Sequence, residues 1–147
     1  MGARGSAFVV ILHGGRVLLV QSRADRRWQL PGGRIEKDET AWGAARREVS
    51  EETGLSVRIV SLTGVYPRRK PGRVYVFGGR VARPDLLSGP NREIRRQRWM
   101  SPEDALRHLS KGARRRLREA LRRPSNFRAR PGFARRLPPL LATLGTA

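Results

Sequence analysis

The chain has 147 residues, a length that suits one domain burying about 68–70% of the surface of the unfolded chain. It contains no cysteine and no apolar run of about 18 residues, so we expect no disulfide, zinc–thiolate site or transmembrane helix, and a cytoplasmic location. Lys and Arg outnumber Asp and Glu by 32 to 12, and the formal net charge of +20 favours anionic partners over basic ones.

The first part of the chain predicts a β-hairpin followed by a basic loop. Residues 6–12 and 16–22 are rich in β-branched and apolar side chains, and a turn signal at residues 13–15 joins them. Three arginines follow, the first of them Arg23, in a segment that is either a solvated basic loop or a phosphate-binding loop. Residues 31–33, Pro-Gly-Gly, then predict a tight loop whose backbone can approach a ligand closely.

We expect a helix over residues 40–53 that carries three glutamates on one face. Glu48, Glu51 and Glu52 are spaced i, i+3 and i+4, so their side chains project from the same side of the helix. Like charges at this spacing destabilise an isolated helix by roughly 0.2–0.5 kcal/mol per pair, which predicts a neutralising cation. Oxygen ligands, without Cys or a nearby His, suit Mg²⁺ or Mn²⁺ rather than Zn²⁺. Gly54 stands where a left-handed C-cap residue is expected.

The rest of the chain alternates strand-like and turn-like segments before a basic end. Residues 101–104, Ser-Pro-Glu-Asp, are typical of a helix start, and a later arginine-rich helix is expected to end before Pro124. Residues 107–147 hold 12 of the 32 basic residues and a single acid. We therefore divide the chain into a domain, 1–123, and a basic tail containing Pro and Leu, 124–147, which either docks on the domain or extends from it. The other expected elements are strands at 57–66, 73–82 and 94–100 and loops at 67–72 and 83–93.

Residues 33–55, GRIEKDETAWGAARREVSEETGL, resemble the Nudix box, the signature of the Nudix hydrolase family. That box reads Gly, five residues, Glu, seven residues, then Arg-Glu-U-x-Glu-Glu-x-Gly-U with U aliphatic, and every position matches. The resemblance implies a fold of class α/β, the Nudix fold, which is an α/β/α sandwich with a central mixed sheet. It also implies Mg²⁺-dependent hydrolysis of a diphosphate linkage in a nucleoside diphosphate derivative. The fixed positions of the box are Gly33, Glu39, Arg47, Glu48, Glu51, Glu52 and Gly54.

The resemblance also implies which residues bind the metal ion. Glu48, Glu51 and Glu52 are the expected Mg²⁺ ligands, with Mn²⁺ as a possible substitute, and Glu52 is expected to be essential. Glu93 lies beyond the box, where some family members place a further metal-binding glutamate, and the Gly32 carbonyl is expected to assist. The general base stays open between Glu48, Glu51 and Glu93.

Further residues near the box have implied roles outside the metal site. In Nudix hydrolases an arginine shortly before a tryptophan, here Trp28, often holds substrate phosphates, and Arg23 is the best-placed candidate. Arg47 is expected to lie off the metal face and to pair with Glu39 or Glu51, holding the loop on the helix. Gly33 is expected to shape the loop ahead of the helix.

The substrate type follows less directly from the resemblance. Residues 30–33, Leu-Pro-Gly-Gly, resemble the family members that act on nucleoside triphosphates, so a nucleotide of that type is expected. RNA 5′-triphosphates, ADP-ribose and dinucleoside polyphosphates stay open as alternatives, and the basic tail would suit RNA. A non-catalytic nucleotide- or RNA-binding Nudix domain is the alternative of another class, although an intact carboxylate set argues against it. The charge itself has a second interpretation, because the basic residues are nearly all Arg, whose codons are GC-rich.

Overall fold

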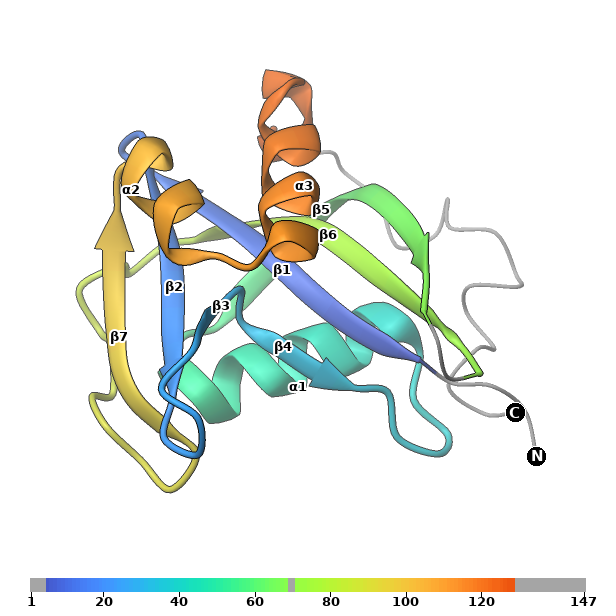
Figure 1. Ribbon diagram of the computed structural model, residues 1–147, viewed down its shortest axis with the longest axis horizontal. Coiled ribbons are helices and arrows are strands. Elements are labelled where there is room, and N and C mark those ends of the chain that lie inside the picture. Colours follow the sequence, from blue (N-terminus) through green and yellow to red (C-terminus); the bar gives the residue numbers. More distant parts are fainter. Residues whose placement is uncertain (1–4, 69–70, 129–147) are drawn as a thin grey trace.

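The computed structural model describes residues 5–68 and 71–128, and most of the tail, for which docking and extension were both left open, lies outside these ranges. Within them, no helix combines the length and the hydrophobicity that a membrane crossing requires. The elements, shown in Figure 1, are β1 (Ser6–His13), β2 (Arg16–Ser22), β3 (Trp28–Gln29), β4 (Gly32–Arg34), α1 (Ala41–Thr53), β5 (Val57–Pro67), β6 (Arg73–Val81), β7 (Ile94–Met100), α2 (Pro102–His108), α3 (Lys111–Leu121) and the 3₁₀ turn η1 (Pro124–Phe127).

The strands form a mixed sheet, which confirms the expected fold class. Strand order is β3-β2-β1-β6-β5, with β4 also paired to β1 and β7 also paired to β2. β1 and β6 are parallel from the Ser6–Val74 pair to the Ile11–Gly79 pair, whereas the other strand pairs are antiparallel. A parallel pair needs a long crossover, and the segment containing α1 and β5 provides it.

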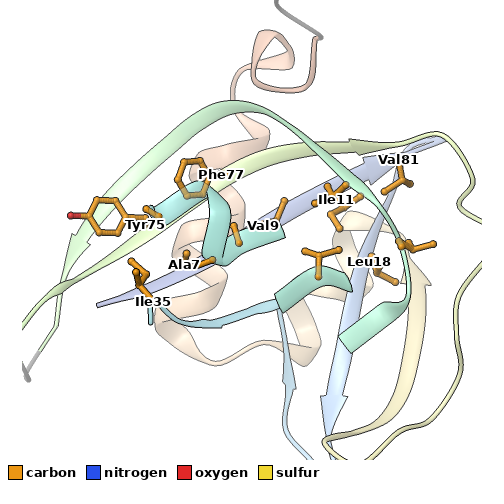
Figure 2. Packing of buried hydrophobic residues seen from close by; sticks show 14 residues of the cluster. Ala7, Val9, Ile11, Leu18, Ile35, Tyr75, Phe77 and Val81 are labelled. Atoms are coloured by element: carbon orange, nitrogen blue, oxygen red, sulfur yellow. The ribbon is translucent and has the colours of Figure 1, made fainter. Parts of the chain in front are cut away.

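Helices cover both faces of this sheet because the strands alternate apolar side chains between them. Val9 and Ile11 pack on one face with the apolar side of α1, in the cluster that Figure 2 shows together with Phe77. Val10 and Val76 point to the other face, into a second cluster with residues of α2, α3 and η1. Figure 1 shows α1 and α3 on opposite sides of the strands. The expected α/β/α sandwich is therefore confirmed.

The predicted hairpin is present, but its two strands separate soon after the turn. β1 and β2 pair only at Leu12–Val17 and His13–Arg16. Beyond these pairs β1 continues beside β4 and β6, while β2 continues beside β3 and β7. The short segment from β3 to β4 therefore bridges two diverging strands, since β3 belongs to one branch and β4 to the other.

Part of the tight loop expected at residues 31–33 is in fact the strand β4. Gly32 pairs with Phe8 of β1 and has a φ of +153°, a conformation that favours glycine. A Cβ at Gly32 would lie 2.3 Å from the Ala7 carbonyl oxygen and 2.6 Å from the Phe8 Cα. Glycine at this position therefore allows two backbones to approach closely. A loop prediction from sequence does not include that contact.

The chain continues to pack on the sheet beyond α3. Phe127 is buried in the second cluster, and the Arg80 side chain donates to its carbonyl oxygen at 3.0 Å. The Ser61 hydroxyl donates to the Asn126 carbonyl at 2.6 Å, and a Cβ at Gly78 would lie 2.4 Å from that same oxygen. The turn η1 is therefore seated in a space that glycine leaves open on β6.

Several arginines of α3 contact the domain rather than forming a free basic face. The guanidinium carbons of Arg115 and Arg116 lie 5.5 and 5.6 Å from the centre of the Tyr66 ring. The Arg114 side chain donates to the Leu106 and Leu109 carbonyls at 3.0 and 3.2 Å. These three arginines therefore link α3 to α2 and to β5, and their guanidinium groups contact the protein as well as solvent.

Replacing Gly78 by alanine should destabilise the protein by about 1–3 kcal/mol, because the added methyl group overlaps backbone atoms of η1 that cannot easily move. Gly112→Ala is the matched control: the nearest atom to a Cβ there is 3.6 Å away. It lies within α3 and should stabilise by about 0.5–1 kcal/mol. Urea unfolding measures both, and equal stability of Gly78→Ala and wild type would contradict the seating of η1.

Candidate active site

The helix α1 begins and ends where its sequence predicts. The Thr40 hydroxyl caps the N-terminus by accepting from the Gly43 N–H at 3.0 Å. Gly54 follows the last helical residue in the left-handed conformation, with a φ of 75°, and its N–H donates to the Ser50 carbonyl. Ala45 and Val49 are fully buried against the sheet, which fixes the rotation of the helix and hence the direction of its glutamates.

Three carboxylates meet beside this helix, and one of them comes from a distant loop. Each of Glu48, Glu52 and Glu93 offers an oxygen, and these atoms all lie within 4.8 Å of one another. Glu93 immediately precedes β7, so the sheet brings it to α1 across about forty residues of chain. Glu51, expected on the same face, is not part of this group: its side chain is 53% exposed and accepts from Arg47 at 3.2 Å.

Glu52 is the most buried carboxylate of the group. It is 4% exposed, and the Gly32 N–H donates to its Oε1 at 2.9 Å. Burial raises the pKa of Glu52 to about 8, with smaller contributions from the negative charges of Glu48 and Glu93, while the bond from Gly32 acts in the opposite direction. Without a cation, the ionised form of this side chain is therefore unfavourable at neutral pH.

Glu48 occupies space that a glycine leaves free. A Cβ at Gly33 would lie 2.6 Å from the carboxyl carbon of Glu48, so a larger residue in β4 would displace the carboxylate. Burial raises the pKa of Glu48, and Arg47, which donates to its Oε1 at 3.0 Å, opposes this shift. Gly33 and Gly32 therefore fit β4 closely against two of the three carboxylates.

Arg47 holds the loop ahead of α1 onto the helix, as predicted. It donates to both oxygens of Glu39, at 2.8 and 2.9 Å, and to the Arg34 carbonyl at 3.0 Å. The hydrogen bond from Arg47 keeps the pKa of Glu39 below its ordinary value. The expectation that Arg47 lies off the metal face is only partly met, because its long side chain also reaches Glu48 and Glu51.

The donor set of this cluster fits a hard divalent cation. All three side chains offer carboxylate oxygens, and two of them have pKa values raised by burial, so a bound cation would relieve both desolvation and mutual repulsion. Glu48, Glu52 and Glu93 are the residues that could hold it. The Gly32 carbonyl was expected to assist, but the contact that the structure gives Gly32 in this site is its N–H, which donates to Glu52.

The family model of the NUDIX domain matches residues 3–123 of the chain. The chain belongs to the Nudix hydrolase family. The MutT-like protein of Streptomyces ambofaciens is 35% identical over 118 residues, which cover 78% of this chain and 74% of that protein.

Other Nudix relatives carry more specific names. The putative 8-oxo-dGTP diphosphatase of Bacillus subtilis (strain 168) is 35% identical over 98 residues, covering 65% of each chain. Diphosphoinositol polyphosphate phosphohydrolase 3-alpha of Mus musculus is 38% identical over 99 residues, covering 63% of this chain and 59% of the relative. The match therefore spans less than two thirds of the length of these two relatives.

Solved structures show the same fold. A NUDIX hydrolase from Nitrosomonas europaea superposes with a TM-score of 0.74 at 20% identity, covering 88% of this chain and 76% of that one. An Ap4A hydrolase from C. elegans, in a binary complex, gives a TM-score of 0.68 at 25% identity, covering 80% of this chain and 95% of that one. The arrangement of strands and helices is thus that of the Nudix fold.

Arg23 of this Nudix domain lies beside the loop that carries Glu93. Its main-chain N–H donates to the Glu93 carbonyl at 2.8 Å, and its Nε donates to the Asn91 carbonyl at 3.1 Å. Figure 1 shows the loop after β2 next to the loop before β7, as these bonds require. These two bonds hold Arg23 on the loop that carries Glu93.

A cavity of about 650 Å³ opens next to β3, between the loop after β2 and the start of α3. Trp28 and Phe8 give it aromatic walls, and Phe8 pairs with Gly32, so the cavity adjoins the backbone that contacts Glu52. His108 also lines the cavity and meets the Trp28 ring edge-on, with 5.7 Å between the ring centroids. Its arginines are Arg26, Arg27 and Arg116.

Sequence reasoning missed two polar residues at this site, Asn91 and Gln97. Both donate to the carbonyl oxygen of Glu52, at 3.2 and 2.6 Å. Asn91 follows a proline in a turn-rich loop, a setting in which Asn often accepts from an N–H two residues further on. That signal could have predicted its local bond to Glu93 but not its contact with α1.

Glu52→Gln should make the metal-free protein more stable at pH 8. Because burial raises the pKa of Glu52 from 4.5 to about 8, the folded wild type holds this proton more tightly than the unfolded chain and loses stability as pH rises between those values. Glutamine removes the charge, so the gain should be on the order of 1–3 kcal/mol at pH 8 and should vanish near pH 4.5.

Thermal unfolding in EDTA across this pH range measures the effect. Glu103→Gln, which changes an exposed glutamate in the first turn of α2, is the control and should change little. Wild type should gain melting temperature on addition of Mg²⁺, and Glu52→Gln should gain much less. A Glu52→Gln protein that is less stable than wild type in EDTA at every pH would contradict the charge argument.

Proposed function

We propose that this Nudix domain hydrolyses a diphosphate linkage with the help of a divalent cation, Mg²⁺ or Mn²⁺, held by Glu48, Glu52 and Glu93. The observation that carries the proposal is the convergence of these three carboxylates within 4.8 Å, one of them almost fully buried. A purely structural role does not account for it, because burying and crowding carboxylates costs free energy without a compensating charge.

The difficulty of the reaction is electrostatic, and the chain's own residues address it in distinct ways. A bound divalent cation neutralises charge on the diphosphate and lowers the pKa of the attacking water. Glu52 is the innermost ligand, and the Gly32 N–H orients its carboxylate. Arg47 holds Glu48 and Glu51 and so restrains the outer side of the cluster. The candidates for the general base are the same three that the family resemblance implies, namely Glu48, Glu51 and Glu93.

Arg23 supports substrate binding from the opposite loop. It adjoins Glu93, and a guanidinium group can bind phosphate oxygens with two parallel hydrogen bonds. The positive charges of Arg96, Arg26 and Arg23 lower the pKa of Arg95, a sign of crowded cations at this edge. We propose that Arg23 binds a phosphate of the substrate next to the cation.

For the substrate itself we propose a nucleoside triphosphate. The cavity beside β3 combines aromatic walls, from Trp28 and Phe8, with arginines that can bind phosphates. An aromatic wall suits a nucleobase, which stacks on it with about 1–3 kcal/mol per base. A relative named as a putative 8-oxo-dGTP diphosphatase, 35% identical, supports the same substrate class.

A second candidate substrate is a more highly phosphorylated molecule. The relative named diphosphoinositol polyphosphate phosphohydrolase, 38% identical, and the arginines around the cavity favour it. The chain's net charge of +20 would also favour this substrate, because a strongly positive protein raises the local concentration of polyanions.

For the cellular location of the protein we propose the cytoplasm, because the chain contains no cysteine that could form a disulfide.

The protein should hydrolyse one of the candidate substrates in the presence of Mg²⁺ or Mn²⁺, giving phosphate or pyrophosphate from a triphosphate or a diphosphoinositol polyphosphate, and two phosphorylated organic products from ADP-ribose or a dinucleoside polyphosphate. A screen of nucleoside triphosphates, 8-oxo-dGTP, ADP-ribose, dinucleoside polyphosphates and diphosphoinositol polyphosphates tests it. Glu52→Gln should lower kcat by at least about 100-fold, since it removes a charged ligand without changing size. Glu103→Gln should keep wild-type activity. A fully active Glu52→Gln protein would contradict the proposed mechanism. A wild-type protein that is inactive on every substrate of the screen would favour a non-catalytic binding domain.

Glu93→Gln should raise the Mg²⁺ concentration needed for half-maximal rate by about 10-fold or more, because it removes one of three carboxylates from the cluster. Glu36→Gln, an exposed glutamate of the box that is absent from the cluster, serves as the control. Metal titrations at saturating substrate measure the shift. Unchanged metal dependence in Glu93→Gln would make Glu93 an ordinary loop residue.

A further inference from the structure

The loop that carries Glu93 also caps the C-terminal end of α1. The last carbonyl groups of an α-helix have no partner within the helix. Here the Ser88 N–H donates to the Thr53 carbonyl at 2.9 Å, and the Gln97 side chain donates to the Glu52 carbonyl at 2.6 Å. The Asn91 amide donates to the same Glu52 carbonyl at 3.2 Å. Helix and loop are therefore joined at the residue that bears the buried carboxylate.

Asn91 connects this helix end to Glu93 through a single side chain. Its Nδ2 faces the carbonyl of Glu52, and its Oδ1 accepts from the main-chain N–H groups of Glu93 and Ile94 at 3.0 and 2.9 Å. The Asn91 N–H also donates to the Ile94 carbonyl at 2.9 Å, which closes the turn. One planar amide thus sets the separation between the backbones of two carboxylate-bearing residues.

Gln97 makes a second connection from β7. Its Nε2 donates to the carbonyls of Glu52 and Gly89, at 2.6 and 3.0 Å, and its Oε1 accepts from the Gly89 N–H at 2.9 Å. The side chain therefore fixes Gly89, in the middle of the loop between β6 and β7, and the end of α1 to the same strand. Because it lies beyond Glu93 in the chain, it restrains the loop independently of Asn91.

These contacts oppose a force that would otherwise separate the site. Glu48, Glu52 and Glu93 repel one another whenever they are ionised, and Glu93 is exposed on a surface loop rather than on a helix or strand. Residues that orient metal ligands commonly matter for affinity nearly as much as the ligands do. The amides of Asn91 and Gln97 are the groups that tie this loop to the helix at the level of Glu52.

We propose that Asn91 and Gln97 are positioning residues that hold the Glu93 carboxylate against those of Glu48 and Glu52, ready to receive a divalent cation. The proposal rests on the metal-binding role proposed above for the three glutamates. Neither amide contacts the cation or the substrate in this account. Both act by fixing the distance between a loop and a helix end.

The test measures Mn²⁺ binding directly, through the loss of the electron paramagnetic resonance signal of free Mn²⁺. Asn91→Ala removes the bridge, and Gln97→Met keeps length and neutrality while removing its hydrogen bonds. Asn126→Ala is the matched control, because the Asn126 amide also donates to a helix carbonyl, that of Ala120 at 2.9 Å, but at the end of α3. Circular dichroism and melting temperature in EDTA are recorded for each variant.

Asn91→Ala and Gln97→Met should each weaken Mn²⁺ binding by about 10–100-fold, while Asn126→Ala loses melting temperature without losing Mn²⁺ affinity. If Asn91→Ala fails to fold, the Mn²⁺ affinity of Gln97→Met decides whether the amides have the proposed positioning role. Wild-type Mn²⁺ affinity in the folded variants would overturn the positioning role and leave the proposed function standing. A wild-type protein that binds no Mn²⁺ would instead overturn the proposed function itself.

Discussion

The constraint on which the site depends is the burial of the Glu52 carboxylate. A carboxyl group with 4% exposure needs a fixed hydrogen-bond partner, which the Gly32 N–H supplies, whereas the two neighbouring carboxylates disfavour its ionised form. The Gly32 N–H reaches Glu52 from β4, which glycine at position 32 allows to lie close against β1. Burial of this carboxylate costs stability at the place where we propose that a cation binds, a common relation between stability and activity.

Local features of the sequence predicted local structure well. Thr40 and Gly54 mark both ends of α1 because each acts through hydrogen bonds to residues within four positions. Spacing along the helix likewise places Glu48 and Glu52 together, since residues i and i+4 are neighbours on any helix. Spacing does not show the side-chain contact of Glu51, which lies outside the three-carboxylate group and accepts from the same Arg47 Nη1 that donates to Glu48.

Features that depend on distant parts of the chain were predictable only through family resemblance or not at all. Glu93 joins the cluster because β7 pairs with β2, a contact between segments about seventy-five residues apart that periodicity cannot show. The strand pairing of Gly32 and the contacts of Asn91 and Gln97 with α1 have the same origin. A turn signal predicted the β1–β2 hairpin but not its divergence, because the parallel partner β6 lies far ahead in sequence.

The position of Glu93 near the start of the last strand has a consequence for synthesis on the ribosome. When α1 emerges, the chain already carries the Nudix box but lacks the third carboxylate and both amides that hold it. The cluster is complete only after β7 has been made and has docked on β2. A chain released before residue 93 would therefore have the signature of the family without the three-carboxylate cluster.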